Sequence, residues 1–153
     1  MMEGGCTCRS VRYRVAASPI IVHCCHCRWC QRETGSAFVI NAIVETSALH
    51  VTGETEMVNT PSQSGKGQRI VRCPKCHVAL WSHYSRPGTA LAFVRVGTLD
   101  NPDAVPPDVH IFTSSKQPWV RLPERALSFA QFYNVPDVWS AEALARATAA
   151  REA

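Results

Sequence analysis

The chain has 153 residues, 46% hydrophobic and 18% charged, which suits one compact domain with an ordinary core. No apolar run approaches the roughly 20 residues of a membrane span, and the first ten residues, MMEGGCTCRS, lack the features of a secretory signal. We therefore expect no membrane partner and a cytoplasmic location. The net charge of +4 comes without a run of lysine and arginine, which argues against nucleic acid as a partner.

The first third of the chain predicts short strands. VRYRV at 11–15 alternates apolar and polar residues, and PIIVH at 19–23 predicts a strand that leads into a group of cysteines. AFVINAIV at 37–44 is almost continuously apolar and β-branched, which is typical of a buried strand. LHVTGETEMV at 49–58 predicts two strands around Gly53.

The middle of the chain continues this pattern. TPSQSGKGQ at 60–68 is rich in turn-forming residues and predicts an exposed loop. Strands are predicted for QRIVRC at 68–73, VALWSHY at 78–84 and TALAFVRVGTL at 89–99. DNPDAVPPD at 100–108 holds three prolines and predicts a turn or loop.

The last part of the chain predicts two further short strands and one helix. The strands are VHIF at 109–112 and PWVRL at 118–122. The helix is predicted over 140–153, with Ser140 as its N-cap and Glu142 in its first turn. The expected fold is a mostly β single domain of short antiparallel strands over 1–139, followed by a C-terminal helical extension.

All eight cysteines lie in three tight groups, in which strands lead directly into cysteines. The groups are Cys6 and Cys8; Cys24, Cys25, Cys27 and Cys30; and Cys73 and Cys76. Thiols stay reduced in the cytoplasm, so metal ligation is a better explanation of the clustering than disulfides.

The pair Cys73 and Cys76, in CPKCH at 73–77, has the spacing of a zinc knuckle. One knuckle supplies two thiolates, whereas a structural zinc takes four ligands. Cys6 and Cys8 are the natural complement, because both sulfurs of a Cys-x-Cys turn can reach one ion. The four sulfurs would form a closed site that contributes to folding.

The remaining group, in CCHCRWC at 24–30, offers several ligand sets. Cys25, Cys27 and Cys30 could hold a zinc ion with its fourth position open to water or substrate, as in a reactive site. Cys24, Cys27 and Cys30 form an alternative triplet, and His26 could close the site. Neighbouring side chains point apart, so we expect His26 to face away from an ion shared by Cys25 and Cys27. A second structural zinc and a free redox cysteine are the other interpretations.

Four segments together resemble a known family. They are GGCTCRSVRY at 4–13, CHCRWCQRETGSAF at 25–38, RCPKCHVAL at 72–80 and HIFTSSKQPWV at 110–120. The combination is similar to the glutathione-dependent formaldehyde-activating enzyme family, which includes the relatives of centromere protein V. The resemblance implies zinc-pinned β-tents and two zinc ions per chain. The structural zinc would be held by Cys6, Cys8, Cys73 and Cys76, and the catalytic zinc by Cys25, Cys27 and Cys30.

The resemblance also implies an activity, namely a zinc-dependent carbon–sulfur lyase that acts on glutathione and formaldehyde through S-hydroxymethylglutathione. Two positions depart from the family pattern. His77 stands where glycine is usual, and glycine suits a left-handed turn better than histidine does. Gln31 stands where arginine is frequent, and Arg32 follows it. Both departures leave the thiol and the aldehyde open.

Glutathione carries two carboxylates, and Arg28 and Arg32 flank the cysteine group as candidate substrate-binding residues. The alternative is that both are solvent-exposed surface arginines. His83 and Tyr84 could transfer protons, although a structural role is the more common one for such residues. At the level of function, the alternatives are a non-catalytic zinc module for a thiol ligand or a protein partner, and a thiol or aldehyde sensor without turnover.

Overall fold

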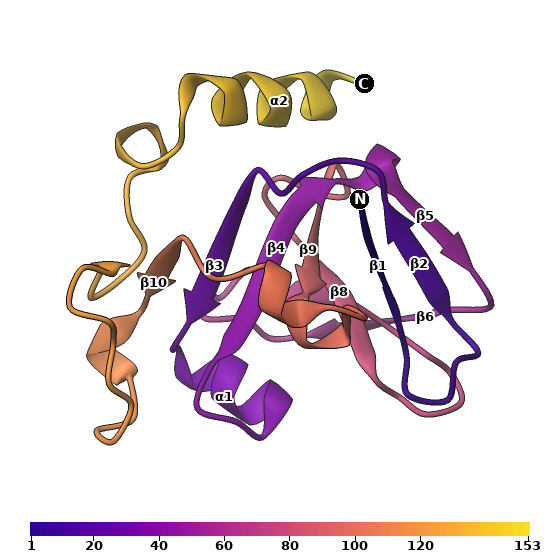
Figure 1. Ribbon diagram of the computed structural model, residues 1–153, viewed down its shortest axis with the longest axis horizontal. Coiled ribbons are helices and arrows are strands. Elements are labelled where there is room, and N and C mark those ends of the chain that lie inside the picture. Colours follow the sequence, from indigo (N-terminus) through magenta and orange to yellow (C-terminus); the bar gives the residue numbers. More distant parts are fainter.

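The computed structural model describes residues 1–153 as a mostly β domain, as the sequence predicts, with two α-helices. Figure 1 shows a small antiparallel sheet beside a larger sheet. The small sheet has the order β1-β2-β5, with β1 at Met2–Gly5, β2 at Arg12–Val15 and β5 at Leu49–Thr52. The larger sheet has the order β11-β10-β3-β4-β9-β8-β7-β6. Its strands are β3 (Ile21–Cys25), β4 (Val39–Glu45), β6 (Glu56–Thr60), β7 (Gln68–Arg72), β8 (Ala79–Tyr84), β9 (Leu91–Arg95), β10 (Val109–Ile111) and β11 (Leu127–Ser128).

The larger sheet is partly parallel, whereas the sequence predicted only antiparallel strands. β10 runs parallel to both β3 and β11, while the other pairs are antiparallel. In this register His110 lies beside Cys24, and Ile111 lies beside Cys25. The pairing thus brings a late segment of the chain against the central cysteine group.

Two apolar clusters form the core. The first is shared by the two sheets and includes Val15 of β2, Val44 of β4 and Leu80 of β8, all fully buried. The second joins β3, β4 and β9 to the C-terminal segment, where Tyr133 and Ala147 pack against them. Cys25, Cys27 and Cys30 of the central cysteine group belong to the second cluster, so these three residues lie inside the packed interior.

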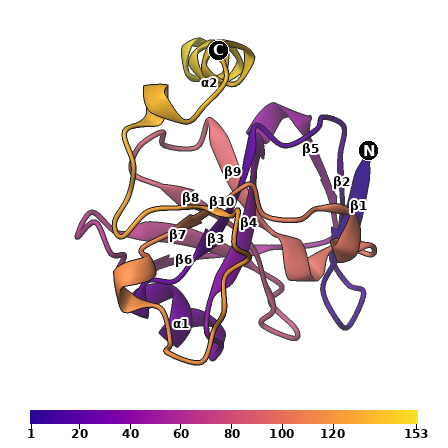
Figure 2. The same ribbon diagram turned by 60° about the vertical axis from the view of Figure 1, so that its left-hand side comes forward.

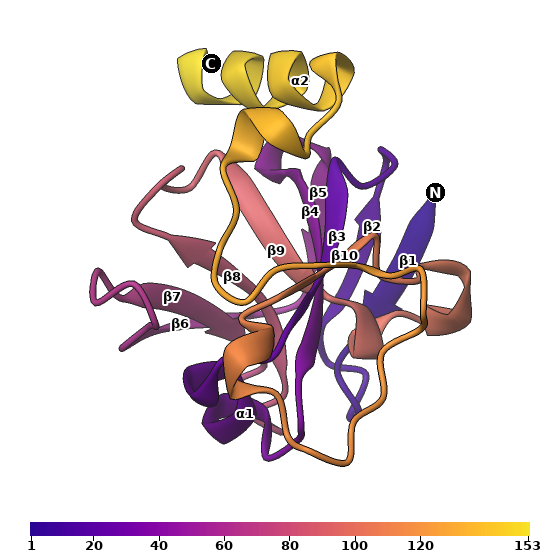
Figure 3. The same ribbon diagram turned by 90° about the vertical axis from the view of Figure 1, so that its left-hand side faces the viewer.

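The C-terminal helix is confirmed as α2 (Ala141–Glu152), with the Ser140 hydroxyl accepting from the Ala143 N–H at 3.1 Å. Figures 2 and 3 show α2 lying across one end of the sheet, with α1 at the opposite end. Arg146 fixes α2 by a paired contact with the Glu45 carboxylate at 2.7 and 2.8 Å. Neither helix has the length and apolarity that crossing a membrane would demand.

The second helix, α1 (Arg28–Thr34), contradicts the expectation that only the C-terminus is helical. Cys27 caps it, because its sulfur accepts from the Cys30 N–H at 3.3 Å. Gly35 ends it in the left-handed conformation, with φ 63°. The helix has seven residues, which is too short to produce a clear apolar period in the sequence.

The strand predicted over 118–122 is also wrong. These residues form a turn followed by irregular chain, in which the Val120 N–H donates to the Gln117 carbonyl at 3.1 Å. No strand pairs with residues 118–122, and a segment without a hydrogen-bonded partner strand does not become part of a sheet. Two strands, β1 at Met2–Gly5 and β11 at Leu127–Ser128, were not predicted from the sequence.

Candidate metal centres and the adjoining cavity

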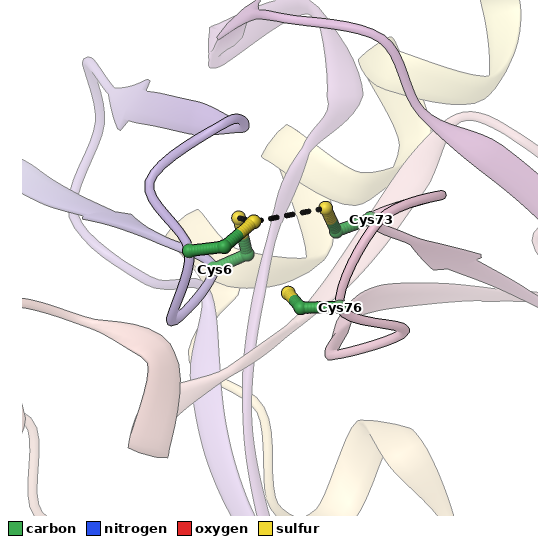
Figure 4. A group of neighbouring side chains, drawn as sticks. Cys6, Cys73 and Cys76 are labelled. Atoms are coloured by element: carbon green, nitrogen blue, oxygen red, sulfur yellow. Dashed lines mark hydrogen bonds between the residues drawn. The ribbon is translucent and has the colours of Figure 1, made fainter.

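The first centre joins the two sheets. Cys6 and Cys8 lie in the loop between β1 and β2, and Cys73 and Cys76 lie in the turn between β7 and β8. All four sulfurs lie within 4.8 Å of one another, and Figure 4 shows those of Cys6, Cys73 and Cys76 directed toward a common point. The Cys8 sulfur is 3.5 Å from that of Cys6 and 3.7 Å from that of Cys73. A tetrahedral zinc with Zn–S bonds near 2.3 Å separates its sulfurs by roughly 3.8 Å, so this tetrad fits the ion.

The turn that carries Cys73 and Cys76 contains a strained residue. His77 has φ 60°, which lies in the left-handed region. This is the conformation expected for a position where glycine is usual. Its N–H donates to the Cys73 carbonyl at 2.9 Å, and its own carbonyl accepts from Arg72 at 2.9 Å. The turn therefore keeps a conformation that suits glycine, although it carries histidine.

The second centre is the trio Cys25, Cys27 and Cys30, whose sulfurs also lie within 4.8 Å of one another. Cys25 ends β3, Cys27 caps α1 and Cys30 follows in its first turn, and all three are buried. Hydrogen bonds from the Cys25 and Cys30 thiols lower the pKa of Cys27 to about 3, while contact with Cys27 raises the pKa of Cys25. Three thiolates this close repel one another, so full deprotonation requires a cation between them. The donor set suits zinc.

A third group lies on the opposite face of β3. Side chains alternate along a strand, so Cys24 and His26 point away from Cys25 and Cys27. The His26 Nε2 atom lies 3.5 Å from the Cys24 sulfur and 3.0 Å from the His110 Nδ1 atom. The structure therefore places neither Cys24 nor His26 with the trio. Burial lowers the pKa of His26 to about 4 and also lowers that of His110, which keeps both rings neutral at pH 7.

A cavity of about 360 Å³ adjoins the trio. Much of its wall is aromatic or aliphatic, from Trp29, Tyr84, Phe93, Ile111, Phe112 and Phe132. Two cations also line it, Lys66 in the loop after β6 and Arg86 in the loop after β8. Burial, with a smaller effect of the nearby sulfurs, raises the pKa of Tyr84. The phenol of Tyr84, which lines the cavity, therefore stays protonated at neutral pH.

The structure does not bring Arg28 and Arg32 to this cavity. They line a separate surface hollow of about 730 Å³ with Gln117 and Trp119, and Arg28 donates to the Gln31 side chain at 2.8 Å. Lys66 and Arg86 were not predicted from the sequence, since both lie in turn-rich segments that do not indicate which cavity they reach. His83 does not line the cavity and contacts the Leu91 carbonyl through Nδ1 at 2.9 Å.

Fold and site together define a class, namely small β proteins with cysteine clusters suited to metal ions, one of which borders a cavity. The model of one family, the glutathione-dependent formaldehyde-activating enzymes, matches residues 1–115. The chain belongs to this family.

The chain is similar to two known proteins, to one in sequence and to the other in structure. A Halomonas elongata protein with the provisional name of glutathione-dependent formaldehyde-activating enzyme is 28% identical over 132 residues, which cover 82% of this chain and 83% of that protein. A crystal structure of a Rhodobacter sphaeroides protein is similar with a TM-score of 0.48 and 20% identity, and the match covers 65% of this chain and 88% of that one.

Proposed function

We propose that the chain is a zinc-dependent carbon–sulfur lyase that interconverts glutathione, formaldehyde and S-hydroxymethylglutathione, or a related thiol–aldehyde pair. The observation that carries this proposal is the buried trio Cys25, Cys27 and Cys30 at the wall of a ligand-sized cavity. Family membership supports the choice of glutathione and formaldehyde. The function requires free thiols, which a reducing cytoplasm maintains.

The chain would hold two zinc ions in this function. Cys6, Cys8, Cys73 and Cys76 would hold a structural ion, since their four sulfurs leave no position for a substrate. Cys25, Cys27 and Cys30 would hold the catalytic ion, with three ligands from the protein. When bound to the trio, zinc would keep a substrate thiol deprotonated near neutral pH.

The residues around the cavity would bind and orient the substrates. Lys66 and Arg86 would pair with the two carboxylates of glutathione, because they are the cations that line the cavity. In the reaction the thiol sulfur bonds to the aldehyde carbon as the C=O π bond breaks, and the aldehyde oxygen takes up a proton in place of the one that the thiol releases. The Tyr84 phenol, which stays protonated, would donate a hydrogen bond to that oxygen as its charge develops. Arg28 and Arg32 remain candidates for contact with a substrate portion that extends beyond the cavity.

The proposal is tested by exchange NMR on glutathione, formaldehyde and their adduct at equilibrium. We expect the protein to raise the exchange rate above that of the uncatalysed mixture. Cys27→Ser should remove this effect and one zinc ion while the fold remains, because serine still caps α1. An unchanged rate with the wild-type protein would refute the enzyme. Glutathione binding without acceleration would indicate a thiol-binding module instead.

A further inference from the structure

The group of Cys24, His26 and His110 takes no part in the proposed function. Their side chains are buried, with 2%, 0% and 9% of their surface exposed, and their ligand atoms lie within 4.8 Å of one another. It is unusual for a thiol and two imidazoles to be buried side by side. Burying a polar group costs free energy unless the group has hydrogen-bond or metal partners.

The backbone positions these three residues firmly. Cys24 and His110 are direct neighbours in the parallel pair of β3 and β10, so their side chains leave the same face of the sheet. His26 follows Cys24 by two residues, and its N–H donates to the Ile111 carbonyl at 3.0 Å. The His26 carbonyl accepts from the Gln31 side chain at 2.7 Å and from the Ser115 hydroxyl at 3.0 Å. Three donors from two segments, residues 24–26 and β10, are therefore held at fixed positions.

The distances fit a shared ion. A tetrahedral site with Zn–N bonds near 2.1 Å and Zn–S bonds near 2.3 Å separates two nitrogens by roughly 3.4 Å, and a nitrogen from a sulfur by roughly 3.6 Å. The corresponding distances here are 3.0 Å between the imidazole nitrogens and 3.5 Å between His26 and the Cys24 sulfur. A shift of a few tenths of an ångström would bring all three donors onto one ion.

A simple hydrogen bond explains less of the geometry. One proton between His26 and His110 would account for their 3.0 Å contact. It leaves the Cys24 sulfur with only a weak contact at 3.5 Å. The Nδ1 atom of His26 is buried without a hydrogen-bond partner under either interpretation.

We propose that Cys24, His26 and His110 form a third metal site, which binds a borderline divalent ion of the zinc type and ties β10 to β3. One thiolate and two imidazoles are the ligands that such ions prefer over the hard cations Mg²⁺ and Ca²⁺. The site is independent of the proposed enzyme function, because it shares no ligand with the trio or the tetrad.

X-ray absorption at the zinc edge separates this site from the other two. The tetrad and the trio offer only sulfur, so zinc–imidazole scattering reports on the third site alone. We expect this signal in the full-length protein reconstituted with Zn²⁺. It should be absent from Cys24→Ala and from His110→Phe, each of which should also bind one ion fewer than wild type by elemental analysis. His83→Gln, which removes a buried histidine outside the group, should retain the signal and the full ion count.

The ions that remain in each variant serve as a control for folding, since an intact tetrad and trio require the native arrangement. Absence of imidazole scattering from the wild-type protein would overturn the proposal. An equal ion count in wild type, Cys24→Ala and His110→Phe would overturn it as well. Neither result bears on catalysis by the trio, which the exchange measurement tests separately.

Discussion

At the scale of single residues, His77 concentrates strain in the turn that carries Cys73 and Cys76. A residue with a Cβ atom at φ 60° costs more than glycine there, and this turn makes its backbone hydrogen bonds without using the imidazole. We expect His77→Gly to stabilise the metal-bound protein by about 0.5–1 kcal/mol. Urea unfolding at pH 7 measures this difference.

Lys75 provides the matched control, because it is exposed in the same turn and its φ is not positive. Lys75→Gly should leave the stability unchanged or lower it, since glycine there only adds freedom to the unfolded chain. If both glycine variants shift the unfolding midpoint equally, the strain at His77 is not the cause.

The two cations that line the cavity, Lys66 and Arg86, should contribute to the binding of glutathione. Replacing Lys66 or Arg86 with methionine should raise KM for glutathione about tenfold, because a charge-assisted hydrogen bond to a carboxylate contributes about 1.5 kcal/mol. We expect kcat to change little, since neither side chain touches the reacting carbon in this assignment. Steady-state kinetics at several glutathione concentrations separate the two constants.

Arg28→Met and Arg32→Met are the matched controls, because both arginines lie in the separate hollow on α1. We expect a smaller change in KM from either. A larger effect of the α1 variants than of the Lys66 and Arg86 variants would transfer carboxylate recognition to the residues first selected from the sequence.

At the scale of elements, α2 depends on one ion pair as well as on its buried alanines. Arg146 holds the pKa of the Glu45 carboxyl below its usual range, chiefly through their hydrogen bonds. A lowered carboxyl pKa stabilises the folded state at pH values above the unfolded pKa, near 4.3, and this stabilisation is lost as the pH falls through the folded pKa. We expect Arg146→Met to cost about 1 kcal/mol at pH 7. The cost should shrink as the pH falls below about 4.3.

Urea unfolding of wild type and variant across pH 7 to 3.5 measures this gap. The difference between the two proteins cancels the acid sensitivity of the cysteine clusters, which both share. Arg151→Met, in the last turn of α2 with an exposed side chain, should show no gap at any pH. A gap for Arg146→Met that is constant with pH would show that lost packing, rather than the ion pair, destabilises the variant.

The elements that the sequence predicted well are those whose signal is local. β7 and β8 were predicted from the short segments QRIVRC and VALWSHY, and α2 follows from Ser140 and the alanine-rich segment after it. α1 was missed because a cysteine sulfur caps it, in place of the usual hydroxyl or carboxylate.

The candidate sites follow the same division. The spacing in the sequence was enough to group Cys73 with Cys76 and Cys25 with Cys27. The position of His110 beside Cys24 depends on the pairing of β10 with β3, which joins segments far apart in the chain. Such non-local pairing leaves no mark in either segment, and the same holds for the approach of Lys66 and Arg86 to the cavity.

At the scale of the whole molecule, the tetrad connects the small sheet to the larger one. Its sulfurs come from the loop before β2 and the turn after β7. An ion there closes a long loop and contributes on the order of 10 kcal/mol of metal binding to folding. We therefore expect a strong chelator to lower the thermal midpoint of the wild-type protein by well over 10 °C, as a loss of several kcal/mol would do in a domain of this size.

Differential scanning calorimetry with and without chelator checks this expectation. The Cys27→Ser variant should show a similar drop, because its tetrad is intact, whereas Cys73→Ser should already be destabilised before chelator is added. A wild-type midpoint that chelator does not move would remove the tetrad from the forces that hold the two sheets together.

The alternation along β3 has an evolutionary consequence. Cys24 and Cys25 are adjacent in the chain, yet they serve opposite faces of the sheet. A single inserted or deleted codon in this strand would exchange the two faces. Cys24 and His26 would then point toward the cavity, and Cys25 and Cys27 would point to the other side of the sheet. Point substitutions can tune either face alone, but any change in the length of this strand alters both at once, so we expect descendants of this gene to vary in its composition and to keep its length.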